Sequence, residues 1–377
     1  MKEAVIVWAK RTPVGKCGGS LKDVPPQHLA APLIRALVTE TGIVPEEIDD
    51  VILGNTVGPG GNLARLSALT AGLPVKVPGV TVDRQCGSGL EAIVTACRLV
   101  QSGAGEVYVA GGVESTSLAP WKMDKPAHPV KAPRIFTRAR FSPDHIGDPE
   151  MGEAAENVAE AFRISRRDQD EYALKSHQKA VRAQKEKRFT GEIVPVEHVM
   201  ADECPREDTS MEKLSSLLPV FREGGSVTAG NACPINDGAA VALVLSMDKC
   251  REYGLMPVLK FIDGTAAGVD PNLLGIGPVP AVGRLLERNR LTSDDIDLVE
   301  FNEAFASQVL ASLRELNIPE HKVNIGGGAL AIGHPYGASG AILLTRLFHE
   351  MKKGQLGLAT LGIGGGMGLA ALFERIE

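Results

Sequence analysis

Residues 86–115, CGSGLEAIVTACRLVQSGAGEVYVAGGVES, and residues 337–366, GASGAILLTRLFHEMKKGQLGLATLGIGGG, read alike at an offset of 251 with no gap. Each stretch is a Gly/Ser turn, a helix of about four turns, a glycine-containing turn, and a strand that ends in glycines. Ser88 falls on Ser339, and Gly89 falls on Gly340. We interpret the match as an internal repeat, and this repeat decides the predicted fold.

A second pair of segments supports the repeat at nearly the same offset. EEIDDVILGN (46–55) resembles DDIDLVEFNE (294–303) at an offset of 248. Each segment is an acidic helix end followed by a strand. Chance similarity between two ordinary strand–helix units is the alternative, but two ungapped matches in the same order favour duplication.

The repeat predicts three regions, at residues 1–115, 116–255 and 256–377. The two outer regions alternate short β-branched strands with amphipathic helices, which is typical of parallel sheets covered by helices. The middle region begins with a Pro-rich, basic segment (119–145) and continues with a long charged helical stretch (152–189). We expect it to be a lid or substrate-binding insertion that ends with the last strand of the N-terminal half.

Composition excludes several functional classes. The chain has 377 residues, a net charge of −6 and only 4% aromatic residues, which argues against a nucleic-acid partner. The first residues read as a strand rather than a signal peptide. The longest apolar stretch, 356–373, is interrupted by six glycines and does not resemble a membrane helix. We therefore expect a cytosolic protein without a membrane partner.

The six cysteines do not form a metal-binding or redox pattern. They stand at positions 17, 86, 97, 204, 233 and 250, and no pair has C-x-x-C spacing. This spacing argues against a zinc site, and a reducing compartment argues against a disulfide framework. We expect no metal, and each cysteine is by default a small buried residue.

Cys86 needs a different interpretation. In VTVDRQCGSGLEAIV (80–94) a strand ends, a cysteine stands at the turn, and Gly-Ser-Gly precedes a helix. The free N–H groups and the dipole at a helix N-terminus stabilise a thiolate, as in a nucleophile elbow with Cys in place of Ser. Taken alone, the motif fits either a nucleophile or a buried cysteine that begins a helix.

Two further loops carry polar side chains that could serve such a nucleophile. GGALAIGHPYGASGA (327–341) places His334 in a glycine-lined loop before the second repeat helix, opposite the Cys86 turn. A neutral histidine there could take the thiol proton or donate to an oxyanion, although a lone histidine is more often structural. EFNEAFA (300–306) places Asn302 after a strand, either as a helix cap or as a ligand for a water or a substrate oxygen.

Together these motifs resemble the thiolases, the acyl-CoA C-acetyltransferases. The resemblance rests on CGSG, SVTAGNACPINDGAA, NEAFA, GGALAIGHPYGASGA and IGGGMG, which occur in the family's order and span the chain. It implies an α/β fold, a duplicated five-layer α-β-α-β-α core with an inserted loop domain, as a homodimer or homotetramer. It also implies acetyl transfer between acyl-CoA molecules or thiolysis of 3-oxoacyl-CoA, with coenzyme A as the substrate carrier and no separate cofactor.

The resemblance also implies roles for individual residues. Cys86 corresponds to the acyl-accepting nucleophile, and His334 to the histidine that activates it and lines one oxyanion hole. Asn302 would hold the water of that hole, and the backbone N–H groups of Cys86 and Gly364 would form the second hole. Coenzyme A would lie along the insertion, where the family's contacts correspond to Arg206, Phe221, Ala229, Cys233, Met151 and Phe305.

The sequence departs from the family pattern at the position of its second catalytic cysteine. The family usually has LCIGGGMG, and that cysteine is the base that removes the α-proton of the second acyl-CoA. Here the position is Gly362, between Leu361 and Ile363. A related subgroup carries a cysteine in the NEAF motif instead, but this chain keeps Glu303 there.

Two smaller departures are Glu150, where a histidine is common before Met151, and Cys233, where a serine often contacts pantetheine.

From these residues we predict a thiolase that acylates Cys86 but forms carbon–carbon bonds slowly. A CoA thioester hydrolase using the same cysteine and a non-catalytic CoA-binding protein remain as alternatives. A ketosynthase is more distant, because it usually needs two histidines and only His334 stands in a fitting loop.

Overall fold

The computed structural model describes residues 2–126, 128 and 130–377. Its strands are β1 (Ala4–Arg11), β2 (Gly15–Lys16), β3 (Asp50–Gly54), β4 (Gly79–Val82), β5 (Val107–Ser115), β6 (Lys122–Asp124), β7 (Arg134–Phe136), β8 (Asn236–Ser246), β9 (Leu259–Gly268), β10 (Leu298–Phe301), β11 (Leu356–Ile363) and β12 (Met367–Arg375). Its α-helices are α1 (Pro26–Thr41), α2 (Leu63–Ala71), α3 (Ser88–Ser102), α4 (Met151–Ala161), α5 (Arg166–Lys185), α6 (Met211–Ser215), α7 (Met247–Glu252), α8 (Pro278–Asn289), α9 (Ala306–Leu316), α10 (Ala329–Ile332) and α11 (Tyr336–Glu350). Short 3₁₀ turns are η1 (Pro45–Glu47), η2 (Pro271–Ile276), η3 (Ser293–Asp295) and η4 (Glu320–Lys322).

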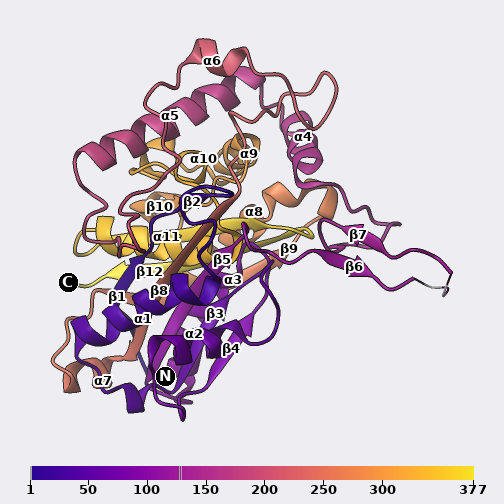
Figure 1. The fold of residues 1–377 in the computed structure, drawn as a ribbon. Coiled ribbons are helices and arrows are strands. Elements are labelled where there is room, and N and C mark those ends of the chain that lie inside the picture. The colour runs from indigo at the N-terminus through magenta and orange to yellow at the C-terminus, as the bar shows by residue number, and fades with distance from the viewer. Residues whose placement is uncertain (1, 127, 129) are drawn as a thin grey trace.

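Ten strands form one sheet in the order β10-β11-β12-β9-β1-β8-β5-β3-β4, with β2 paired to β8 (Figure 1). The sheet contains two half-sheets, β1-β8-β5-β3-β4 and β9-β12-β11-β10, which meet where Val5 and Ile6 of β1 pair with β9. Strand β8 lies between β1 and β5, so the segment after the insertion completes the N-terminal half-sheet. The first four strands of the N-terminal half-sheet, β1-β8-β5-β3, match β9-β12-β11-β10 in order and in sense of pairing, and β4 is an additional strand at the edge.

The expectation of parallel sheets is wrong for most of the strand pairs described in this sheet, since the parallel ones are β3–β4, β3–β5 and β10–β11. Strand β5 is parallel to β3 and β10 is parallel to β11, but β8 and β12 run antiparallel to their neighbours. The reason at the C-terminus is a hairpin, because Gly365 and Gly366 adopt φ values of +88° and +80° between β11 and β12. Glycine accepts this left-handed conformation at little cost, so the chain turns back at once.

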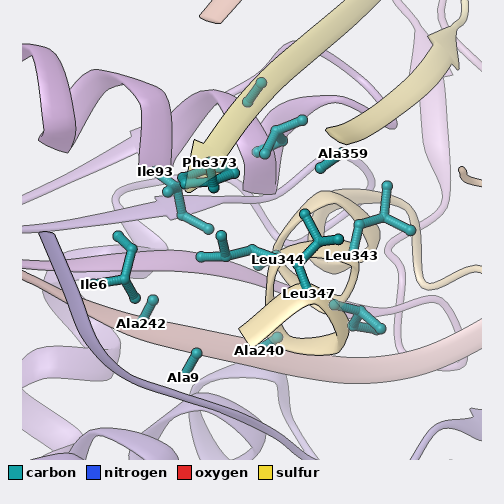
Figure 2. Packing of buried hydrophobic residues seen from close by; sticks show 14 of the residues in the cluster. Ile6, Ala9, Ile93, Ala240, Ala242, Leu343, Leu344, Leu347, Ala359 and Phe373 are labelled. Carbon is teal, nitrogen blue, oxygen red and sulfur yellow. The ribbon is translucent and has the colours of Figure 1, made fainter. Parts of the chain in front are cut away.

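Helices cover both half-sheets and also fill the space between them. Helices α1 and α2 pack on the outer face of the N-terminal half-sheet, and α8 and α9 pack on that of the C-terminal half-sheet. Helices α3 and α11 lie between the half-sheets in the largest apolar cluster, where Ile6, Ile93, Leu344 and Phe373 meet (Figure 2). Truncating one such buried leucine to alanine typically costs about 2–5 kcal/mol.

The insertion is only partly the long helix that its charge pattern predicts. The helix ends at Ala161, and a new one begins at Arg166 with a capping box formed by Ser165 and Asp168. Arg163 adopts φ +52°, which a continuous helix excludes. In Figure 1, α5 and α6 lie above the core, and the β6–β7 hairpin extends to the right. Ala127 and Pro129 of the Pro-rich segment are outside the described residues.

Across the described part of the chain, every helix is too short or too polar to cross a membrane.

Candidate active site

Cys86 stands in a strained turn between β4 and α3. The preceding residue, Gln85, adopts φ +46°, which is uncommon for a residue other than glycine. Side-chain hydroxyls help to hold this turn: the Ser88 hydroxyl donates to the Gln85 carbonyl at 2.6 Å, the Thr56 hydroxyl donates to the same carbonyl at 3.1 Å, and the Arg84 N–H donates to Ser88 Oγ at 2.8 Å. Strain held in this way at a turn is typical of functional positions.

The resting form of Cys86 is the thiol, not the thiolate expected from its helix N-terminus. Burial raises the pKa of Cys86 to about 11, although a hydrogen bond from the Gly364 backbone N–H opposes the rise. Desolvation therefore outweighs the helix dipole and the donor. At neutral pH the thiol needs a base before it can act as a nucleophile.

The crossing of α3 and α11 brings the loop that carries His334 to the Cys86 turn. An ideal Cβ on Gly89 would lie 2.6 Å from the Gly337 carbonyl oxygen, and one on Gly340 would lie 2.6 Å from Leu90 Cβ. The two helices can touch this closely only because both positions are glycine. Cys86 precedes Gly89 by three residues, and His334 precedes Gly337 by three, so the contact joins the loops that carry them.

Hydrogen bonds fix the ring of His334. Its Nδ1 lies 2.6 Å from Ser339 Oγ, and its Nε2 lies 3.4 Å from Asn302 Nδ2. The backbone N–H of His334 donates to Asn236 Oδ1 at 2.9 Å. An amide NH₂ can only donate, so Nε2 carries the lone pair and Nδ1–H donates to Ser339.

The imidazole of His334 is therefore neutral at physiological pH. It is 2% exposed, and burial lowers its pKa to about 4. Asn302, 1% exposed at the end of β10, is held by its backbone N–H on the Thr360 carbonyl at 3.0 Å. The structure thus brings together the predicted His334 and Asn302, and it brings Gly364 to Cys86.

Position 362 is filled from the other side by an amide. An ideal Cβ on Gly362 would lie 2.5 Å from Gln308 Nε2 and 3.4 Å from the Gly275 carbonyl oxygen. Gln308, on α9, is 2% exposed, and no described residue accepts a hydrogen bond from its Nε2. A glutamine amide does not titrate near neutral pH, so Gln308 supplies no general base at this position.

Glu303 and Glu150, which the sequence singled out, are both held by partners of their own. Glu303 is buried and accepts hydrogen bonds from Tyr172, Ser176, Asn324 and the Leu330 N–H, which is a structural set of partners. Glu150 is exposed before α4 and pairs with Arg138 at 3.1 Å.

The residues predicted to contact coenzyme A fall into two adjoining groups. Arg206 and Ala229 line a cavity of about 440 Å³. Its other lining residues are Lys16, His177, Glu203, Cys204, Asp208, Thr209, Lys213, Leu214, Leu217, Gly230, Ala232, Pro234 and Leu330. Lys16, Arg206 and Lys213 give this cavity cationic side chains suited to phosphate groups.

The second group forms a wall beside that cavity. The rings of Phe221 and Phe305 meet edge to face with centroids 6.0 Å apart. Gly152, directly after Met151, faces the Phe221 ring. Ala232, which also lines the cavity, pairs with Phe305, and the Cys233 N–H donates to the Ala304 carbonyl at 2.9 Å.

Reasoning from sequence missed the side chains that support this site. Ser339 had a signal, because the repeat matches it to Ser88, and each serine holds the loop before its helix. Gln308 and Asn236 had none, since both reach their partners through tertiary packing.

Comparison with known proteins places this site in a family. Residues 4–248 match the family description "Thiolase, N-terminal domain", and residues 255–375 match "Thiolase, C-terminal domain". VraB of Staphylococcus epidermidis, provisionally named an acetyl-CoA C-acetyltransferase, is 51% identical over 383 residues, covering 100% of this chain and 99% of that protein. VraB of Staphylococcus aureus, with the same provisional name, is 49% identical and covers 100% of both chains.

A solved structure agrees with the sequence relatives. The crystal structure of the Bacillus anthracis acetyl-CoA acetyltransferase has a TM-score of 0.93 and 41% sequence identity, covering 100% of this chain and 99% of that one. The predicted mixed α/β thiolase fold is confirmed by this match. The chain therefore belongs to the thiolase family of acyltransferases.

Proposed function

We propose that this protein is an acetyl-CoA C-acetyltransferase that carries its acyl group on Cys86, taken from acetyl-CoA or from a 3-oxoacyl-CoA. One observation carries the proposal: the half-buried Cys86 thiol, with the Gly364 N–H on its sulfur, stands in a loop that the crossing of α3 and α11 joins to the loop of a neutral His334. The names of the relatives and the family match support the same activity.

The acylation step follows from these groups. His334 Nε2 accepts the thiol proton while the sulfur attacks the thioester carbonyl. The backbone N–H groups of Cys86 and Gly364 donate to the oxyanion that forms, and each such donor is typically worth roughly 3 kcal/mol of the barrier. The bond to the CoA sulfur then breaks, and CoA leaves with the proton from His334. Asn302 holds the water of the other oxyanion hole, the one lined by His334.

We further propose that condensation is slow because position 362 lacks a thiol. The Gln308 amide, which fills the space, has no titratable group near neutral pH. A missing general base typically costs about 10²–10⁴-fold. Without a base for condensation, water or a second thiol is left as the acyl acceptor, so thioester hydrolysis is the second candidate activity.

Two measurements test these proposals together. Intact-mass spectrometry after incubation with acetyl-CoA is expected to show one acetyl group, and Cys86→Ala is expected to show none. Chromatography of the products is expected to show free CoA with little acetoacetyl-CoA. A protein without an adduct overturns the acylation proposal, while tight CoA binding without labelling indicates a non-catalytic protein. Acetoacetyl-CoA formation as fast as in a thiolase that has the cysteine overturns the missing-base proposal.

The domain and partner assignments are proposals of the same kind. The layering of helices and half-sheets supports a duplicated five-layer core built on residues 1–115 and 256–377, with 116–255 as the insertion that binds CoA and ends with β8, the last strand of the N-terminal half. Exposed apolar side chains at Trp121 and Val75, 86% and 81% exposed, support assembly into a homodimer or homotetramer. Light scattering at several concentrations tests the assembly, and a monomer at every concentration contradicts it.

A further inference from the structure

A small cavity lies beside the residues that contact the His334 ring, because both Ser339 and Asn302 line it. Its volume is about 20 Å³, room for about one water molecule. It is lined by Glu300, Asn302, Gly327, Gly328, Ala329, Ile332, Gly333, Ser339, Ile342, Leu343 and Arg346. Most of this lining is apolar or backbone, so the polar side chains that face it stand out.

Helix α11 presents these polar groups on one stripe. Ser339, Ile342, Leu343 and Arg346 follow the i, i+3, i+4, i+7 spacing of one helix face. On the opposite wall, Glu300 of β10 is on the face of the sheet that packs against α11. The stripe thus begins and ends with a polar residue, and both of these line the same cavity as a buried carboxyl group.

Two polar atoms in this cavity have no partner in the described chain. Glu300 and Arg346 are each 1% exposed. No described residue hydrogen-bonds Glu300 Oε1 or Arg346 Nε, although the guanidinium ends of Arg346 pair with Glu192 and Glu350. Leaving such groups unsatisfied typically costs about 1–3 kcal/mol each. A cavity of this size with several polar partners is the usual setting of a buried water.

We propose that a buried water in this cavity links Glu300 to Ser339 and thereby to His334, making Glu300 a positioning residue for the base that activates Cys86. The chain of donors runs in one direction. His334 Nδ1–H donates to Ser339 Oγ, the Ser339 hydroxyl donates to the water, and the water donates to the Glu300 carboxylate. Arg346 Nε–H donates to the water oxygen.

This chain stabilises His334 at the moment when it becomes charged. When the S–H bond of Cys86 breaks and the proton binds Nε2, the ring becomes an imidazolium with both nitrogens protonated. Its Nδ1–H already has an acceptor, and that acceptor is polarised by a carboxylate two hydrogen bonds away. No proton needs to leave the chain, and no other reactant is consumed. The inference deepens the proposed acylation of Cys86 and rests on it.

The charge of Glu300 depends on its surroundings. Burial raises its pKa to about 8, Arg346 opposes the rise, and Glu350, Glu192 and Glu303 add to it. The carboxylate form, which accepts from the water, therefore becomes dominant as the pH rises through about 8. The pKa of about 11 for Cys86 lies well above this range, so the two titrations are separable.

The test uses the rate at which iodoacetamide alkylates Cys86, because this reaction needs the thiol activated but needs no acyl-CoA. For the wild type we expect the rate to rise near pH 8 and again at higher pH. Glu300→Gln keeps the side-chain volume and is expected to remove the first rise, leave the second, and slow alkylation at pH 8.5 by about 10-fold. Ser339→Ala is expected to do the same, and Ser339→Thr, which keeps the hydroxyl, to restore the rate.

The controls separate the proposed link from general damage. Ser67→Ala removes another buried hydroxyl without a described partner, on α2, and is expected to leave the profile unchanged. The double variant Glu300→Gln/Ser339→Ala is expected to be no slower than either single variant, because both act through one chain. Multiplying effects, or a first rise retained in Glu300→Gln, overturn the proposal. If Glu300→Gln does not fold, Ser339→Ala against Ser339→Thr decides the question.

A crystal structure gives a direct second measurement, and a cavity without an ordered water overturns the link. The acylation assay keeps the two proposals distinguishable. If alkylation depends on Glu300 but no acetyl adduct forms, the link from Glu300 to His334 is retained and the proposed acyl transfer is rejected. If the acetyl adduct forms at the same rate in the wild type and in the Glu300 and Ser339 variants, only the link is rejected.

Discussion

Replacing Gly362 by cysteine is expected to restore carbon–carbon bond formation. The new Cβ would lie 2.5 Å from Gln308 Nε2, so the amide must move. This atom is the far end of a flexible side chain, and rotating it costs little compared with moving backbone. We expect the variant to fold with a loss of stability of about 1–3 kcal/mol, as for a modest overpacking.

The size of the gain follows from what a general base contributes. Supplying one at the correct position is typically worth about 10²–10⁴-fold, or roughly 3–5 kcal/mol of the barrier. The measurement is the initial rate of acetoacetyl-CoA formation from acetyl-CoA, followed by chromatography, together with the fraction of Cys86 acetylated. We expect acetylation to stay within about twofold while condensation rises at least 10²-fold.

Gly362→Ala is the matched control, because it adds the same Cβ and displaces the same amide without a thiol. It is expected to leave condensation as slow as in the wild type. A comparable gain in Gly362→Ala would mean that displacing Gln308, not adding a base, limits the reaction. No gain in a folded, fully acetylated Gly362→Cys protein refutes the reasoning and places the base elsewhere, with Cys233, His334 or a water as candidates.

Replacing His334 by glutamine is expected to slow acetylation of Cys86 by about 10²-fold or more at pH 7, measured by mass spectrometry over time, and equal rates would exclude His334 as the base. Through His334, the free energy of unfolding is expected to fall by about 2 kcal/mol between pH 7 and pH 5. Its pKa is about 4 in the folded state, so only the unfolded state binds a proton in that range. Urea unfolding at both pH values should show a smaller fall for His334→Gln than for the wild type. Gly89→Ala is expected to destabilise the protein by about 1–3 kcal/mol and to slow acetylation, because the new Cβ meets the Gly337 carbonyl. Gly283→Ala in α8 places its Cβ in open space, so the same unfolding assay is expected to show stabilisation by about 0.5–1 kcal/mol. Arg206→Ala is expected to raise KM for acetyl-CoA about 10-fold with little change in kcat, and a lowered kcat at unchanged KM would contradict a role in binding alone.

The internal repeat carried most of the fold prediction. Its two offsets correspond to elements in the structure, since α3 and β5 match α11 and β11, and β3 matches β10. The sense of pairing was not predictable from alternation, because β8 and β12 arrive from segments that the repeat does not include. The break between α4 and α5 was missed because charged residues run through it without a proline or glycine.

The candidate site was predictable where a motif fixes the local backbone. A cysteine before Gly-Ser-Gly and a histidine in a glycine-rich loop can each be recognised from a few neighbouring residues. The charge state of Cys86 was not predictable, because desolvation depends on what packs against it from the rest of the chain. The positions of Gln308 and Glu300 at the site were not predictable for the same reason, since each side chain faces residues of elements that are distant in sequence.

The crossing at Gly89 and Gly340 divides the labour between the two copies of the repeat. In the proposed mechanism one copy supplies the sulfur and the other supplies the imidazole, so we expect neither copy to be active alone. Mutations that weaken the contact between the halves should therefore abolish acetylation activity under conditions in which each half is still folded. Activity therefore reports on the docking of the halves, and an ancestor with a single copy would have needed to pair with itself before it could evolve this reaction.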